Sequence, residues 1–202
     1  MEIEIFADKI FYFKNILKNP EESINMIDTM DGILSKDDVF NKSIIWKASS
    51  PLPNGEDLNY GIKYESRRNR LLSSSEIIKN FYNTIDECYR FAGQYYFEKL
   101  DMEFKEEYYT DFALFRYDTN KEMGPHVDYD GEDWLAPVAT GIIYLNDNKS
   151  GGDLYFKEQD VLIKPTPGSM VIFPCIKPFY HQSTKILSGK KYLIQCGWKR
   201  MV

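Results

Sequence analysis

The sequence predicts a mainly β fold, a sandwich or jelly roll, with two helices packed against one outer face. Aromatic residues make up 15% of the 202 residues, including 15 Tyr and 13 Phe, and aromatic residues favour sheets. From residue 108 onward, short apolar stretches follow one another closely and are separated by turn signals. Two earlier segments have the start signals or the apolar spacing of helices instead.

The first part of the chain, residues 1–107, has the mixed pattern of supporting strands and helices. Residues 2–6 and 9–13 are expected to be short strands. A first helix is expected from Asn19-Pro20 to about Gly32, because a capping residue, an early Pro and two acids open it. A second helix is expected from about Ser74 to Phe97. Its buried face is formed by apolar residues three or four positions apart: Ile77, Phe81, Ile85, Cys88 and Ala92.

Residues 49–72, between the two expected helices, are rich in Ser, Pro, Asn, Gly and Arg. This composition predicts a long loop or a mobile hairpin, and long loops in compact domains are often functional. A surface excursion explains the same composition equally well. The sequence leaves open whether the segment closes over a substrate as a lid.

The second part, residues 108–202, is expected to be a series of short strands that form the core. Turn signals such as Asn146-Asp147-Asn148, Ser150-Gly151-Gly152 and Ser188-Gly189 separate most of them. No linker or internal repeat interrupts the chain, so one domain over residues 1–202 is expected. The expected strands are 109–117, 124–129, 137–146, 153–156, 159–165, 169–174, 178–183 and 190–198.

Charge and cysteine content limit the possible partners and surroundings. The net charge is −6 and the only basic patch is the short run Arg67-Arg68-Asn69-Arg70, which argues against nucleic acid as the principal partner. Cys88, Cys175 and Cys196 are odd in number and lack metal-type spacing, which predicts buried thiols in a reducing cytoplasm. No signal-peptide pattern and no apolar run of membrane-spanning length is present, so a cytoplasmic protein without a membrane segment is expected.

The chain has only two histidines, His126 and His181, and Asp128 follows the first of them. Residues i and i+2 of a strand point to the same face, so His126 and Asp128 are expected to project side by side. In a two-sheet sandwich, the later strand with His181 can add a third ligand. Two His and one carboxylate are typical of non-haem iron(II) oxygenases, because they leave positions open for a cosubstrate and O₂.

The His-x-Asp spacing alone is a weak motif. Because 31 of the 202 residues are acidic, an acid stands at that offset from a given His in about 15% of cases by chance. The alternative for each His is a polar residue held by hydrogen bonds within a β structure.

Two further residues strengthen the metal hypothesis. Lys191 lies ten residues after His181 on the next expected strand, and Tyr144 lies in an otherwise apolar strand. Both could contact a carboxylate of a diacid bound to the metal. Alternatively, Lys191 is a solvated strand end like its neighbour Lys190, and Tyr144 is a packing residue.

The order of several motifs in residues 108–198 is more specific than any one of them. They are Phe115-Arg116-Tyr117, Pro125-His126-Val127-Asp128, Ile143-Tyr144-Leu145-Asn146, Gly151-Gly152-Asp153-Leu154, the stretch Pro167 to Pro174, His181, Gly189-Lys190-Lys191-Tyr192 and Trp198. With these motifs the chain resembles the 2-oxoglutarate/Fe(II)-dependent dioxygenase superfamily, in particular its prolyl 4-hydroxylase-like branch.

The resemblance implies a double-stranded β-helix core, of the jelly-roll or cupin-like kind. It implies that His126, Asp128 and His181 are the iron ligands. It also implies that Lys191 pairs with the far carboxylate of 2-oxoglutarate, that Tyr144 hydrogen-bonds there and that Tyr117 lies near the cosubstrate. The Gly-x-Lys alignment favours Lys191 over Lys190, although the sequence alone does not decide between them.

The implied reaction is hydroxylation with O₂ that converts 2-oxoglutarate to succinate and CO₂, with ascorbate as a candidate reductant. A peptidyl proline is the first-choice substrate. The same chemistry on a free amino acid or small metabolite is one alternative. A metal-binding, cupin-like module without redox chemistry is another, because Zn²⁺ tolerates two His and one Asp. The sequence does not determine the hydroxylated atom or the oligomeric state.

Overall fold

The fold was determined from a computed structural model of the 202-residue chain. It describes residues 2–19, 22, 44–45, 62–65, 76–104, 113–129, 137–147 and 150–199.

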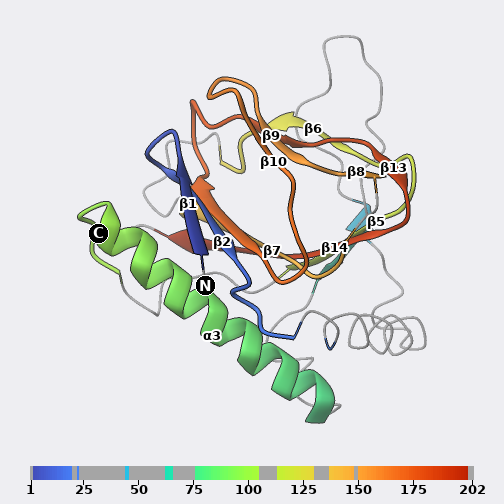
Figure 1. The fold of residues 1–202 in the computed structure, drawn as a ribbon, viewed down its shortest axis with the longest axis horizontal. Helices are drawn as coiled ribbons and strands as arrows, with labels where there is room; N and C mark the ends of the chain where they lie inside the picture. Colours follow the sequence, from blue (N-terminus) through green and yellow to red (C-terminus); the bar gives the residue numbers. More distant parts are fainter. Residues whose placement is uncertain are drawn as a thin grey trace.

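The larger of two facing sheets has eight antiparallel strands in the order β1-β2-β11-β7-β14-β5-β4-β3. Its two longest strands, β7 and β14, lie side by side at the centre (Figure 1). The strands of this sheet are β1 (Glu2–Phe6), β2 (Ile10–Lys14), β3 (Ile44–Ile45), β4 (Ile62–Glu65), β5 (Ala113–Tyr117), β7 (Pro137–Tyr144), β11 (Met170–Pro174) and β14 (Lys191–Lys199).

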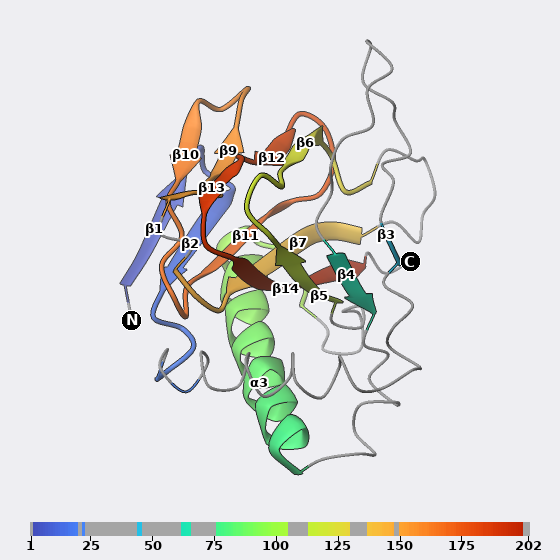
Figure 2. The same ribbon diagram turned by 90° about the vertical axis from the view of Figure 1, so that its right-hand side faces the viewer.

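The smaller sheet has four antiparallel strands in the order β10-β9-β12-β6 and lies above the larger one (Figure 2). A two-stranded ribbon, β8 (Ser150–Gly151) with β13 (Ile186–Ser188), continues beside it. The other strands are β6 (Met123–His126), β9 (Leu154–Phe156), β10 (Val161–Ile163) and β12 (His181–Ser183). A buried cluster that includes Phe156, Phe173 and Leu193 fills the space between the two sheets.

The outer face of the large sheet is covered by one long helix, α3 (Glu76–Lys99) (Figures 1 and 2). Its residues Ile85, Cys88 and Ala92 are buried, as the helical spacing predicts. Tyr89 is also fully buried, and its hydroxyl lies 2.6 Å from the carbonyl oxygen of Ile194 in β14. A second apolar core, separate from the one between the sheets, therefore joins α3 to the sheet.

Trp198 at the end of β14 is the largest fully buried side chain of this second core. Its ring lies 5.8 Å from that of Tyr89 and 6.1 Å from that of Phe97, measured between centroids. A methyl group on Gly93 or Gly141 would come within 2.7 Å of the indole. Both glycines therefore give the indole its room between helix and sheet.

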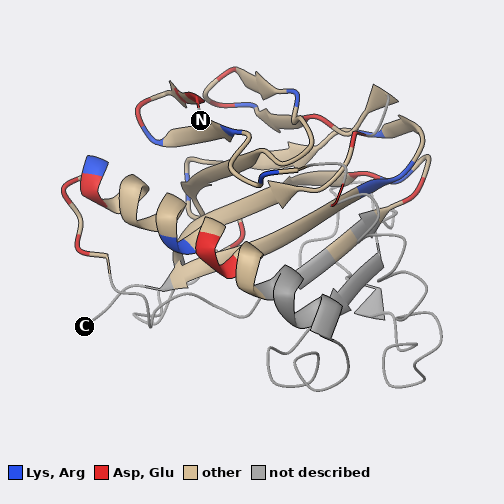
Figure 3. Ribbon diagram, turned by 60° about the horizontal axis from the view of Figure 1, so that its bottom comes forward, with Lys and Arg blue, Asp and Glu red and all other residues tan. Residues whose placement is uncertain are grey.

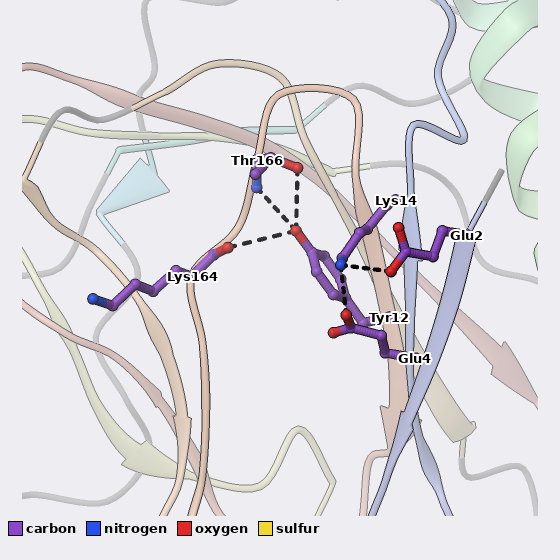
Figure 4. A network of polar contacts seen from close by, with 6 residues as sticks. All are labelled: Glu2, Glu4, Tyr12, Lys14, Lys164 and Thr166. Carbon is purple, nitrogen blue, oxygen red and sulfur yellow. Dashed lines mark hydrogen bonds and ion pairs between the residues drawn. The ribbon is translucent and has the colours of Figure 1, made fainter.

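The β1–β2 hairpin extends the large sheet and is tied to the turn after β10. The Tyr12 hydroxyl accepts a hydrogen bond from the backbone N–H of Thr166 and lies 3.1 Å from the Thr166 hydroxyl (Figure 4). Lys14 on the same strand pairs with Glu2 at 2.9 Å and with Glu4 at 2.5 Å. Because these ion pairs are partly solvated, the buried Tyr12 contact is the stronger link.

Charged residues are scarce in the middle of the large sheet. Among the coloured residues of Figure 3, Lys, Arg, Asp and Glu gather at strand ends, in turns and on α3. Lys191 also lies at a strand end, but unlike most lysines its side chain is buried, with only 1% exposed. No helix in the described part of the chain is long and apolar enough to span a membrane.

Most expected strands are present, usually shorter than predicted. The segment predicted as 124–129 ends as a strand at His126, and 159–165 is reduced to Val161–Ile163. The short strands β8 and β13 were not predicted, because Ser150-Gly151-Gly152 and Ser188-Gly189, which overlap them, have the composition of turns. Cys88, Cys175 and Cys196 are all buried, as predicted.

Other predictions fall on residues outside the described ones. The helix expected from Asn19-Pro20 to about Gly32 is described only at Asn19 and Glu22. Of residues 49–72, only 62–65 are described, and they form β4, which pairs with β5. One domain over 1–202, with support elements in 1–107, stays a prediction, although β1 to β4 join the same sheet as the later strands.

Replacing Tyr89 with Phe removes the hydroxyl that α3 places against the large sheet. We expect a loss of about 1–2 kcal/mol in the free energy of unfolding, because a buried hydrogen bond is lost without loss of ring packing. Urea denaturation measures this. The matched control is Tyr95→Phe on the same helix, where the rings of Phe11 and Phe13 pack and the hydroxyl has no hydrogen bond to the part of the chain that the structure describes. Equal stability of both variants would contradict the prediction.

Candidate metal centre

The pairing of β6 with β12 places the two histidines opposite each other. His126 and His181 are register partners, and the centroids of their rings are 4.3 Å apart. One oxygen of Asp128, Oδ1, lies 3.5 Å from Nε2 of His126 and 3.7 Å from Nε2 of His181. The ligand-type atoms of the three residues lie within 4.8 Å of one another, so one metal ion could bind all three.

Asp128 reaches this point by a different route from the predicted one. Because β6 ends at His126, Asp128 lies in a bend beyond the strand and not on the same strand face. The next residue, Tyr129, donates its N–H to the carbonyl of Cys175 at 3.0 Å, which ties the segment to the end of β11. Strand alternation therefore does not explain the position of the carboxylate, although the three side chains converge.

Both imidazoles are oriented in the same way. Nδ1 of His126 lies 2.8 Å from the carbonyl oxygen of Gly124, and Nδ1 of His181 lies 3.2 Å from that of Phe179. A carbonyl can only accept a hydrogen bond, so each Nδ1 carries the proton. In the neutral ring the lone pair is then on Nε2, which faces Asp128 in both cases.

The protonation states of the three residues suit a metal ion. Burial lowers the pKa of His181 to about 4, so this imidazole is neutral near pH 7. Burial opposes ionisation of Asp128, but His181, His126 and the hydroxyl of Thr140 outweigh it and hold the pKa of Asp128 below its ordinary value. Burial also acts to lower the pKa of His126, but Asp128 more than compensates and raises it. A divalent ion bound at Nε2 of His126 would displace the proton that Asp128 stabilises on this imidazole.

The second oxygen of Asp128 is held by the large sheet. Thr140 in β7 donates its hydroxyl to Oδ2 at 2.5 Å, and the amide of Gln195 in β14 donates to it at 3.2 Å. Oδ1, the oxygen near the imidazoles, is left to bind a metal ion.

A buried cation lies on the same interior face. Lys191 begins β14, and its ammonium donates to the carbonyl of Gly152 at 2.5 Å and to the hydroxyl of Ser183 at 2.8 Å. Gly152 and its neighbour Gly151 have φ near +73°, a conformation that glycine adopts at little cost. Lys190 is exposed, so the structure directs Lys191 inward and Lys190 outward.

The Lys191 ammonium is surrounded by aromatic rings. It lies 5.0 Å from the centroid of Tyr144 and 5.7 Å from that of Tyr117, and both tyrosines are buried. Burial lowers the pKa of Lys191 to about 7, which Asp153 opposes only weakly. Within the described ranges no carboxylate forms an ion pair with it. A bound carboxylate would therefore stabilise the charged form.

Tyr144 has a buried hydroxyl with no hydrogen-bond partner among the described residues. Burial raises the pKa of Tyr144 well above its ordinary value, so the hydroxyl keeps its proton and can donate. Buried polar groups are rarely left unpaired in native proteins. This donor beside a buried ammonium fits a small anionic ligand with its carboxylate between Lys191 and Tyr144.

The structure thus brings together the residues that the sequence singled out: His126, Asp128 and His181 at one point, and Lys191, Tyr144 and Tyr117 at another. It adds Ser183, Thr140 and Gln195, which sequence reasoning missed. Strand alternation could have identified two of them, because Ser183 follows His181 by two residues and Gln195 follows Lys191 by four, so each lies on the same strand face as a predicted site residue. The side chain of Arg116 lies outside the described part, so its direction stays open.

Comparison with protein families gives one match. Residues 112–199 match the model of the 2OG-Fe(II) oxygenase superfamily, and this segment includes all nine of these site residues. A comparison with curated proteins finds no match.

Solved structures with the same fold include three prolyl hydroxylases at low identity. The collagen prolyl hydroxylase of Paramecium bursaria Chlorella virus-1, in complex with 2OG, is 16% identical with a TM-score of 0.64, over 97% of this chain and 98% of that one. A prolyl hydroxylase from Trichoplax adhaerens, in complex with a peptide fragment of hypoxia inducible factor, is 14% identical with a TM-score of 0.63, over 96% and 84%. A prolyl-4-hydroxylase from Pseudomonas putida is 14% identical with a TM-score of 0.62, over 97% and 95%. These likenesses confirm the predicted double-stranded β-helix fold.

The low pKa of Lys191 predicts a pH dependence of stability. The unfolded chain keeps the Lys191 proton up to about pH 10, whereas the folded, ligand-free protein releases it near pH 7. The unfolded state then binds more protons between these values, so this residue makes stability rise with pH. Relative to Lys191→Met, we expect the wild type to gain about 1–2 kcal/mol in unfolding free energy from pH 7 to pH 9.

Urea denaturation at pH 7, 8 and 9 measures this difference. Lys190→Met is the matched control, because Lys190 is exposed and its substitution should leave the pH dependence unchanged. Parallel pH curves for wild type and Lys191→Met would show that the buried amine is not neutralised.

Proposed function

Since residues 112–199 match the model of the 2OG-Fe(II) oxygenase superfamily, we propose that the chain is an oxygenase of this kind that hydroxylates peptidyl proline. The reaction would use Fe(II), 2-oxoglutarate and O₂ and give succinate and CO₂. One observation carries the proposal: a metal-type triad and a buried lysine, which has no carboxylate partner among the described residues, lie on the interior of the same two-sheet core.

His126, Asp128 and His181 would hold the iron. Two neutral imidazoles and one carboxylate suit Fe(II) and leave further positions for a chelating cosubstrate and O₂. When bound, the iron supplies the redox chemistry that activates O₂. The chain's own contribution is orientation, because each Nδ1 is bound to a backbone carbonyl and Oδ2 of Asp128 is bound by two donors.

Lys191 and Tyr144 would hold the far carboxylate of 2-oxoglutarate. Ser183, which already contacts the Lys191 ammonium at 2.8 Å, would add a hydroxyl at the same place. A carboxylate between an ammonium and two hydroxyls gains charge-assisted hydrogen bonds in a setting with little water. It would satisfy the Tyr144 hydroxyl, which has no hydrogen-bond partner within the described ranges.

Apolar side chains keep water from the inner side of the triad. The ring of His181 lies 4.5 Å from that of Phe173 and 5.8 Å from that of Phe156, measured between centroids. Both phenylalanines are fully buried in the core between the sheets. His126 and Asp128, which are 24% and 15% exposed, form the open side from which a substrate would approach.

Peptidyl proline is the substrate class that best fits the comparisons. The similar structures are described as prolyl hydroxylases, and one of them holds a peptide. Asp128 and Tyr129 begin a stretch that is acidic in sequence, Asp128-Tyr129-Asp130-Gly131-Glu132-Asp133, of which residues 130–133 lie outside the described part of the chain. Such a stretch would favour peptides with basic residues near the proline. Ascorbate as a reductant remains a prediction.

Anaerobic calorimetry with Mn(II) in place of Fe(II) tests the cosubstrate site. The wild type should bind 2-oxoglutarate, and Lys191→Met should bind it about 10–100-fold more weakly, because a buried charge-assisted contact is lost. Lys190→Met should bind it as the wild type does. No binding by the wild type would favour the metal-binding module without redox chemistry.

Turnover with Fe(II), 2-oxoglutarate and O₂ tests the substrate class. Proline-containing peptides should gain the mass of one oxygen atom together with an equal amount of succinate. The same peptides with Ala in place of Pro should not, and the Asp128→Ala protein should be inactive on all of them. Oxygen transfer only to free amino acids or small metabolites would leave the chemistry intact and contradict the peptidyl-proline assignment.

A further inference from the structure

We infer that Thr140 and Gln195 are positioning residues that keep Asp128 a one-oxygen ligand of the metal. Together we call them the carboxylate clamp. The inference rests on the proposed function for the presence of a metal ion, but it concerns residues to which neither the motifs nor the comparisons give a role.

The two oxygens of Asp128 have different surroundings. Oδ1 faces the imidazoles, at 3.5 Å from Nε2 of His126 and 3.7 Å from Nε2 of His181. Oδ2 accepts hydrogen bonds from the Thr140 hydroxyl at 2.5 Å and from the Gln195 amide at 3.2 Å. An ionised carboxylate only accepts hydrogen bonds, so both partners must present a donor, and the –NH₂ end of Gln195 must point toward Asp128.

The large sheet places both donors on its inner face. β7 and β14 are antiparallel neighbours in which Gln195 pairs with Ile142 and Gly197 pairs with Thr140. Thr140 and Gln195 are therefore diagonal neighbours that point to the same side. The residue opposite Thr140 is Gly197, which has no side chain to stand between Thr140 and Asp128. Two adjacent, well-paired strands thus fix the positions of the two donors.

Asp128 needs such support because it lies outside any strand. Its backbone follows the end of β6, and no register in either sheet determines its side-chain direction. The two histidines, by contrast, lie within the paired strands β6 and β12. Each is oriented by the backbone carbonyl two residues earlier in the chain, Gly124 for His126 and Phe179 for His181. Of the three proposed ligands, the carboxylate is the one whose direction is determined by residues from other strands.

Gln195 is a polar residue on a strand face whose neighbouring side chain is apolar. The inward residue two positions earlier, Leu193, packs in the core between the sheets. An amide there has to be hydrogen-bonded to be tolerated, and Asp128 supplies the acceptor. With Oδ2 occupied twice, rotation of the carboxylate to bring both oxygens to the metal would break two charge-assisted bonds. The clamp thereby keeps a ligand position open for cosubstrate or O₂.

The test measures metal binding and metal geometry in the absence of turnover. Apo-protein is titrated with Co(II), whose visible absorption bands report coordination number, and with Mn(II) for affinity. We expect Gln195→Leu and Thr140→Val each to bind Mn(II) about 10–100-fold more weakly and to shift the Co(II) bands. Thr140→Ser keeps the hydroxyl and should bind within about threefold of wild type, since the donor is retained.

Gln182→Leu is the matched control. Like Gln195, Gln182 is a partly buried amide on a strand, and it is next to the proposed ligand His181. Its side chain points to the opposite face of the strand from His181 and Ser183, and so away from the metal centre. Its Mn(II) affinity and Co(II) bands should equal those of wild type. Thermal melting of the apo-proteins shows whether each variant folds. If Gln195→Leu does not fold, Gln195→Asn, which is too short to reach Asp128, takes its place.

The outcomes separate this inference from the proposed function. Absence of Co(II) and Mn(II) binding by the wild type would refute the metal site itself. Wild-type binding with unchanged affinity and bands in Gln195→Leu and Thr140→Val would refute the clamp alone. Equal weakening by Thr140→Ser and Thr140→Val would also refute it, because the hydroxyl would then not be the relevant group.

Discussion

The antiparallel pairing of β6 with β12 is the constraint on which the metal centre depends. It sets His126 opposite His181, and in each case Nδ1 contacts the carbonyl oxygen two residues earlier in the chain. Both Nε2 atoms then face the same carboxylate oxygen. A slip of one residue in this pairing would turn an imidazole to the other face of the sheet and separate the ligands.

The two sheets have different parts in the site. The small sheet carries the imidazoles and Ser183, whereas the large sheet carries the buried cation Lys191, the two tyrosines and the donors to Asp128. A buried ammonium costs stability, and so does a buried hydroxyl such as that of Tyr144, which has no hydrogen-bond partner in the described part of the chain. The second core, in which α3 packs its apolar face on the other side of the large sheet around Trp198, consists mainly of apolar and aromatic side chains and offsets that cost. The chain thus separates a stabilising core from a functional one.

Strand β14 couples the two halves of the site. Lys191 and Gln195 stand four residues apart on its inner face, which is about 13 Å along a strand. One end of the strand therefore contacts the anion position and the middle contacts Asp128. Because β14 pairs with β5 and β7 over most of its length, its hydrogen bonds hold both contacts in a fixed relation. In the proposed function, the same rigid element would thus position both the cosubstrate and the metal.

The sequence by itself predicted the mainly β fold, the buried residues Ile85, Cys88 and Ala92 of α3 and the candidate triad, because these depend on alternation, helical spacing or the order of motifs. Only the tertiary structure decided that Asp128 reaches the triad from beyond the end of β6, and that Lys191 points inward while Lys190 is exposed. It also decided which residues support the ligands. Ser183, Thr140 and Gln195 come from three different strands, and hydrogen bonds between strands depend on register, which local residue patterns do not encode.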